Sequence, residues 1–249
     1  MRKYLMQVAI YTQYFSRVLL DSWSLFIYTL GLPVFLMLVN DRKYLGQSLT
    51  WWQYTNLVLP FVAWVVIANT LEMLADVARM REQGYLKQYY SLVVSPSVLI
   101  VSKLLVNLMM LLLIISGVGL VSGWLFHLPV GALLVRLWLT LLLSYLPLVG
   151  LSLPILSWSV RYQSVNAIVN VVALVIMLGS AAVMTAFTIS FNSFIWNLVS
   201  PAFLITDSFY AIGGHFSAFA GAYGGVLLVA LVIGMISYRQ LKILPTEGI

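Results

Sequence analysis

The sequence predicts an all-α membrane protein with six transmembrane helices, an N-terminal interfacial helix, a short cytoplasmic helix after the second span and a re-entrant outer segment before the last. Hydrophobic residues make up 62% of the 249 residues, charged residues 8%, and the mean hydropathy is +1.01. A soluble domain has about 45–50% apolar and about 25% charged residues. This composition excludes an intrinsically disordered chain, and the absence of cysteine excludes a disulfide scaffold or a thiolate metal site.

Residues 1–20 are predicted to form a helix that lies in the inner membrane interface. On a helical wheel, one side is mostly apolar and the other carries Arg2, Lys3 and Arg17, the pattern of a helix that floats at a membrane surface. Met6 and Ile10 fall on the polar side, so the pattern is imperfect. The alternative is a frayed N-terminal tail.

Six apolar runs follow, each near the roughly 20 residues that cross a bilayer as a helix. They cover residues 22–39, 54–74, 97–126, 133–158, 165–189 and 222–238. An even number of spans places both termini on one side of the membrane. A cytoplasmic N-terminus puts all but three of the 13 Lys and Arg residues inside; Arg42, Lys43 and Arg136 are left outside. The positive-inside rule therefore predicts a multi-pass protein of the cell membrane with both termini in the cytoplasm.

Residues 76–95 join the second and third spans on the cytoplasmic side, and most of this stretch is predicted to be a short helix with a possible bend at Gly84. It combines charged residues with tyrosine and leucine, a composition typical of a surface that a protein partner covers. The alternative is a solvated loop whose charges only fix the topology.

Residues 190–221 form an outer segment that is too polar to span the membrane. It nevertheless contains two apolar pieces, 194–196 and 201–205, and Gly213 and Gly214 would allow a turn after them. Two half-helices that dip into the membrane fit this pattern, and a simple outer loop is the alternative. Gly221 and Gly225 then form a GxxxG pair, which allows close helix approach.

Signatures of enzymes are missing from the chain. It has no Gly-Lys dipeptide, no GxSxG and no HExxH motif, so we expect no catalytic residue and no metal site. The ionisable residues Glu72, Lys103 and Arg136 fall near predicted span ends, where long side chains reach the interface. An ion-coupled transporter usually needs such a group at mid-membrane depth. Basic residues occur singly, which argues against nucleic-acid binding.

The stretch from Arg81 to Lys87, R-E-Q-G-Y-L-K, resembles the first cytoplasmic loop of permease subunits of type-2 ATP-binding-cassette (ABC) exporters, which have roughly R-E-x-G-T-L-K/E. Tyr85 replaces the usual small threonine. Residues 94–96, Lys103 and the run 199–203 also resemble that family, and so does the order of the elements along the whole chain.

The resemblance implies a single type-2 ABC transmembrane domain over residues 1–249. Such a subunit moves a hydrophobic or amphipathic substrate, such as a peptide, lipid or drug, out of the cytoplasm or the inner leaflet. Its partners would be a cytoplasmic ABC ATPase, which carries the ATP and Mg, a second permease subunit, identical or related, and membrane lipids. The residues implied at the ATPase interface, on the coupling helix, are Arg79, Arg81, Glu82, Gly84, Tyr85, Leu86, Lys87 and Tyr89.

Two other functions remain open from the residues alone. One is a non-transporting membrane scaffold or immunity-type protein that binds a peptide or lipid. The other is an ATP-independent channel or carrier, which the lack of mid-membrane charges disfavours. The sequence names no substrate and no residue of a substrate path.

Overall fold

The computed structural model describes residues 2–21, 23–85, 93–95, 97–157, 162–186 and 191–240. Within these ranges the chain is helical and forms no strand. The elements, in chain order, are α1 (Arg2–Leu20), α2 (Trp23–Asn40), the 3-10 turn η1 (Arg42–Tyr44), α3 (Trp51–Leu57), α4 (Leu59–Glu82), α6 (Ser97–Leu125), α7 (Val130–Ser152), α8 (Pro154–Ser157), α9 (Tyr162–Ala186), α10 (Phe194–Val199), α11 (Pro201–Tyr210), the π-helical turn η2 (Ala211–His215) and α12 (Phe216–Arg239).

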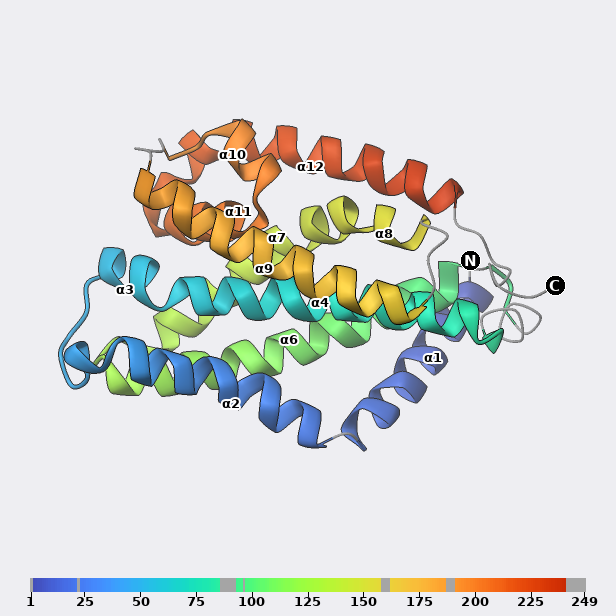
Figure 1. Cartoon of the computed structure of the whole chain (residues 1–249), viewed down its shortest axis with the longest axis horizontal. Helices are drawn as coiled ribbons and strands as arrows, with labels where there is room; N and C mark the ends of the chain where they lie inside the picture. The colour runs from blue at the N-terminus through green and yellow to red at the C-terminus, as the bar shows by residue number, and fades with distance from the viewer. Residues whose placement is uncertain are drawn as a thin grey trace.

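Helix α4 is the central helix of the bundle. Figure 1 shows it running through the middle of an elongated molecule, and it packs against α2, α6, α7, α9 and α11. Most of its side chains are buried. Two of its buried polar side chains are satisfied within the helix, because Asn69 and Thr70 donate to the carbonyls of Val65 and Val66 at 2.8 and 2.7 Å. This back-bonding removes the cost of an unpaired polar group in an apolar interior.

The predicted second span, residues 54–74, differs from the structure at both ends. Two helices replace its start, because α3 ends at Leu57 and α4 begins at Leu59 with Pro60 in its first turn. Proline lacks a backbone N–H and suits the first turn of a helix. Thr50 starts α3 through a capping box with Gln53. At the other end α4 continues to Glu82, so the first part of the predicted cytoplasmic stretch belongs to the same helix.

Helix α1 lies against the beginning of α6. Val8 and Phe15 are buried, and the hydroxyl of Ser102 on α6 donates to the Val8 carbonyl at 3.1 Å. The opposite side of α1 still exposes large apolar side chains. Leu5, Met6, Ile10 and Val18 are 50–63% exposed. A helix is therefore present over residues 2–20, as predicted.

Helices α7 and α12 approach each other closely at two glycines, Gly150 and Gly234. A Cβ placed on Gly150 of α7 would lie 2.5 Å from the carbonyl oxygen of Ala230 on α12, and one on Gly234 would lie 3.4 Å from the Cα of Gly150. The GxxxG pair identified in the sequence has a different setting. A Cβ on Gly221 would meet nothing within 4 Å, and one on Gly225 would meet the ring of Phe194 on α10.

Helices α10 and α11 form a bent pair at one end of the molecule, joined at Ser200 and Pro201. Helix α11 is buried along almost its whole length and packs against α4 and α7. Arg136 of α7 fixes its end. The Arg136 guanidinium lies 4.3 Å from the ring centre of Phe209, and its Nε donates to the Phe209 carbonyl at 2.7 Å. Gly214, with φ 121°, then turns the chain into α12.

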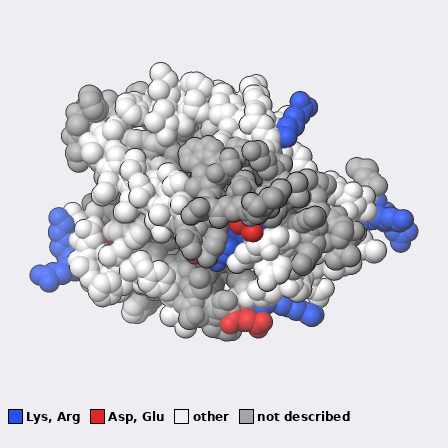
Figure 2. Space-filling model, turned by 45° about the vertical axis from the view of Figure 1, so that its right-hand side comes forward, with Lys and Arg blue, Asp and Glu red and all other residues white. Residues whose placement is uncertain are grey.

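Four stretches in the described residues are helical, long and apolar enough to cross a membrane: Leu59–Glu82, Ser97–Leu125, Val130–Leu156 and Pro201–Arg239. Shorter apolar helical stretches are Ile27–Asn40 in α2 and Ala167–Ser180 in α9. On the face shown in Figure 2, Lys and Arg side chains lie mainly toward the ends and edges of the molecule. An all-helical chain with several helices able to span a bilayer is thereby confirmed for the described residues.

Candidate functional site

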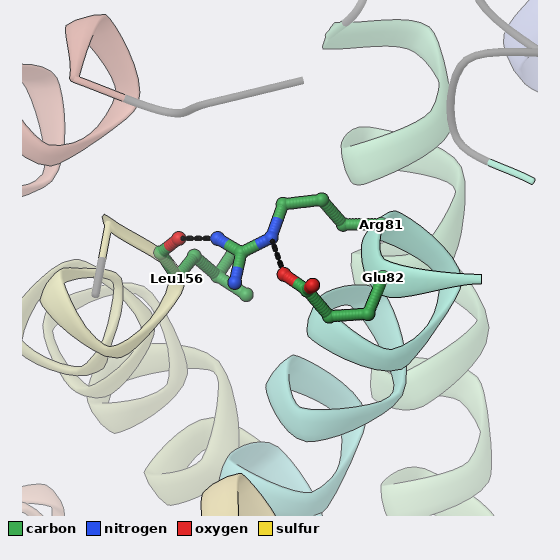
Figure 3. A network of polar contacts seen from close by, with 3 residues as sticks. All are labelled: Arg81, Glu82 and Leu156. Atoms are coloured by element: carbon green, nitrogen blue, oxygen red, sulfur yellow. Dashed lines mark hydrogen bonds and ion pairs between the residues drawn. The ribbon is translucent and has the colours of Figure 1, made fainter. Parts of the chain in front are cut away.

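The last turn of α4 is locked to the neighbouring short helix α8. Arg81 donates from Nε to Oε1 of Glu82 at 2.9 Å and from Nη1 to the carbonyl of Leu156 at 2.7 Å. Figure 3 shows the guanidinium lying between the two helices with one partner on each. The side chains of Arg81 and Glu82 are only 3% and 7% exposed. A charge-assisted hydrogen bond in so dry a place is stronger than the same bond at a surface.

This burial changes the role expected for two predicted interface residues. The family resemblance implied that Arg81 and Glu82 face an ATPase partner on the coupling helix. In the structure Arg81 points inward and connects α4 to α8. Among the described residues of the predicted set, Arg79, which pairs with Asp76 at 3.4 Å, has a 40% exposed side chain, and Tyr85 is 50% exposed.

Gly84 ends α4. Its φ of 75° lies in the left-handed region, and its N–H bonds to the Arg81 carbonyl at 3.0 Å, the arrangement by which glycine commonly terminates a helix. The predicted cytoplasmic helix over residues 76–95 is therefore not one element, because its first part continues α4 and Gly84 breaks it. Leu86, Lys87 and Tyr89 lie outside the described residues.

A cavity of about 450 Å³ lies between α2, α4 and α9. Its wall is mostly apolar and includes Tyr28, Pro33 and Trp64. Two polar residues of α4, Asn69 and Glu72, also line it, and Asn170 of α9 lines it from the facing helix. An apolar hollow with a few convergent polar groups is the usual form of a small-molecule site. The Asn170 side chain is exposed and lines this cavity.

A second cavity, of about 180 Å³, lies between α1, α4 and α6 and shares Asn69 and Glu72 with the first. Asp76 of α4 and Lys103 and Asn107 of α6 complete its polar lining. Sequence reasoning treated Glu72 and Lys103 as side chains at span ends and missed this cluster. The spacing of Asn69, Glu72 and Asp76, at i, i+3 and i+7, places them on one face of a helix and was the signal that could have found it.

Comparison with protein-family models, with curated proteins and with solved structures found no match to this chain. The proposed function therefore rests on how the described helices and cavities are arranged. One unbroken helix, α4, contributes to the walls of both cavities and ends in the charged turn that Arg81 fixes to α8.

Proposed function

We propose that this chain is the membrane-spanning permease subunit of an ATP-driven ABC exporter, and that it contains no catalytic residue itself. A cytoplasmic ABC ATPase would bind at the end of α4 and supply the ATP and Mg. A second permease subunit would complete the path of the substrate across the membrane. The motif from Arg81 to Lys87 supports the proposal by its resemblance to the coupling segment of such subunits.

The observation that carries the proposal is the continuity of α4. A force applied at its charged end reaches Asn69 and Glu72 at the cavities through a helix without a break, since α4 runs from Leu59 to Glu82. Arg81 joins that end to α8, so movement there also displaces the segment that follows α7. Rigid helices that shift as units are the usual carriers of such changes.

The larger cavity suits a hydrophobic or amphipathic substrate. Its wall is mainly apolar, and its lining residues Tyr28 and Leu174 are also exposed at the surface of the bundle. A substrate that is dissolved in the inner leaflet would reach this cavity sideways, without first crossing a polar opening.

The proposal includes a topology with six spans in the cell membrane, both termini in the cytoplasm, and α10 and α11 as the re-entrant outer segment. Figure 1 supports this arrangement, because the start of α1 and the ends of α4 and α12 lie at one end of the molecule, while α10 and α11 lie at the other. The buried α11 satisfies its backbone as a helix, which a segment inside a membrane requires.

Cysteine labelling tests this topology, since the chain contains no cysteine. We expect Gln47→Cys to react rapidly with an impermeant thiol reagent added to whole cells, and Gln83→Cys to react only after the cells are opened. Ile195 on α10 is 66% exposed in the isolated chain, and a re-entrant α10 would turn it toward lipid. Slow labelling of Ile195→Cys is therefore expected, and labelling as fast as at residue 47 would contradict the re-entrant segment.

Affinity purification in mild detergent tests the function. We expect the wild-type chain to retain a nucleotide-hydrolysing partner, and Tyr85→Arg to reduce that partner about tenfold, the scale set by losing an aromatic anchor from an interface. Because Tyr85 is exposed, its replacement should leave the thermal unfolding midpoint of the chain unchanged. Gln47→Arg, at the opposite end, is the matched control and should keep the partner. Purification of the wild-type chain without any nucleotide hydrolase would reject the exporter and favour the non-transporting scaffold.

A further inference from the structure

The smaller cavity brings acidic and basic groups of two helices to the inner side of α1. Glu72 and Asp76 line it from α4 and Lys103 lines it from α6, with Phe15, Val18 and Leu19 of α1 as its apolar side. Its volume of about 180 Å³ is enough for several water molecules. That volume is comparable to a small polar headgroup.

The charges of this cavity are separated rather than paired across it. Asp76 pairs with Arg79 on its own helix at 3.4 Å. The Lys103 ammonium instead lies 4.7 Å from the ring centre of Phe15. In the part of the chain that the structure describes, Glu72 makes no hydrogen bond or ion pair. One carboxylate and one ammonium group therefore remain to be matched by something else, and Glu72 is accessible to a ligand because its side chain is exposed in the isolated chain.

The charge balance indicates what kind of ligand fits. Glu72, Asp76, Arg79 and Lys103 together carry no net charge when all four are ionised. An anionic ligand would satisfy Lys103 but would bring a second negative charge close to Glu72. A zwitterion satisfies both groups, with its positive end on the Glu72 carboxylate and its negative end on Lys103.

The position of the cavity indicates that such a ligand has apolar tails. Its α1 wall belongs to a helix whose outer side exposes Leu5, Met6 and Ile10, as expected for a helix embedded in an interface. The larger, mainly apolar cavity adjoins it, since Asn69 and Glu72 border both. A headgroup in the smaller cavity can thus send a hydrocarbon chain into the larger one.

We infer that these two cavities together bind an inner-leaflet phospholipid with an ammonium headgroup, of the phosphatidylethanolamine type. Its ammonium donates hydrogen bonds to Glu72, its phosphate accepts from Lys103, and an acyl chain lies along Trp64 and Pro33. This lipid site needs no ATPase and no transport. Its test therefore succeeds or fails separately from the exporter proposal.

Native mass spectrometry of the delipidated full chain in detergent tests the inference. The protein is incubated with equal amounts of dioleoyl phosphatidylethanolamine and dioleoyl phosphatidylglycerol, which share a phosphate and differ in the ammonium. We expect phosphatidylethanolamine to be retained about tenfold more than phosphatidylglycerol, because one charged hydrogen bond distinguishes them. Glu72→Gln should abolish this preference. Asp21→Asn, which removes an exposed carboxylate beyond the end of α1, is the control and should retain it.

A second variant and a competitor sharpen the test. Glu72→Asp keeps the carboxylate one methylene shorter and should keep part of the preference, so a loss in Glu72→Gln cannot be ascribed to general unfolding. Glycerophosphoethanolamine, which has the headgroup and no tails, should fail to displace the lipid. The inference is overturned if the wild-type chain retains both lipids equally, if Glu72→Gln keeps the preference, or if the tail-free compound competes as well as the lipid.

Discussion

Replacing Gly150 with leucine is expected to cause a large loss of stability. A Cβ at this position would already lie 2.5 Å from the carbonyl oxygen and 2.8 Å from the carbonyl carbon of Ala230. These are backbone atoms of α12, so no side-chain rotation relieves the clash. Overpacking costs about 1–3 kcal/mol where side chains can adjust. We expect at least the upper end of that range here.

The reason lies in how membrane helices associate. Without a hydrophobic driving force between helices in lipid, close packing of small residues supplies much of the attraction. Leucine at position 150 would push α12 away and lose the contact with Gly234 as well. The thermal unfolding midpoint in detergent, with the fraction that remains monodisperse after heating, measures the effect.

Two glycines provide matched controls for this substitution. A Cβ on Gly131 of α7 or on Gly224 of α12 would meet nothing within 4 Å. Gly131→Leu and Gly224→Leu should therefore unfold close to the wild-type temperature. The unfolding midpoint of Gly150→Ala should lie between the midpoints of these controls and that of Gly150→Leu. If Gly150→Leu unfolded at the same temperature as Gly131→Leu, the close contact between α7 and α12 would not exist.

Replacing Arg81 with alanine is the second change with a large expected effect. It removes the donor to the Leu156 carbonyl and leaves the Glu82 carboxylate, 7% exposed, without its 2.9 Å partner. Removing one member of a buried ion pair costs about 3–5 kcal/mol. We expect the thermal unfolding midpoint to fall by about 6–20 °C, at roughly 2–4 °C for each kcal/mol in a chain of this size.

Two further variants distinguish the loss of the connection between α4 and α8 from the loss of a charge alone. Arg79→Ala removes an ion pair whose side chains are 40% and 44% exposed, and such pairs contribute about 1 kcal/mol or less. Its midpoint should barely move. The double variant Arg81→Ala/Glu82→Gln should recover part of the loss, because the side chain that has lost the Arg81 guanidinium is then neutral. Equal effects of Arg81→Ala and Arg79→Ala would show that Arg81 does not lock α4 to α8.

The helices could be predicted from the sequence because the apolar runs are long. The predicted runs over residues 97–126 and 222–238 have close counterparts in α6 and α12. The errors at the helix ends arose at single residues, whose effect on the backbone is averaged out in a hydropathy window. Pro60 divides the predicted second span, and Pro154 begins α8 where one span was expected to continue. Single residues that change the backbone hydrogen bonding leave almost no trace in a window of 20 residues.

The candidate site was harder to read. The charged stretch after the second span was recognised by its composition, but composition does not show which charges turn inward. Arg79 and Arg81 are two residues apart on one helix, so they point in different directions, one to the surface and one to α8. The cavity residues Glu72 and Lys103 lie on different helices, and nothing local to either one indicates the other.

The sequence by itself determined that this chain is helical and apolar enough to enter a membrane, because both properties are sums over many neighbouring residues. Only the tertiary structure decided which small residues touch. Gly150 and Gly234 lie against each other in one helix–helix contact. Gly221 and Gly225, the GxxxG pair of the sequence, do not share a contact. The reason is that a helix–helix contact depends on the rotation and crossing of two distant segments, and in a chain made mostly of apolar residues the sequence favours no single pairing.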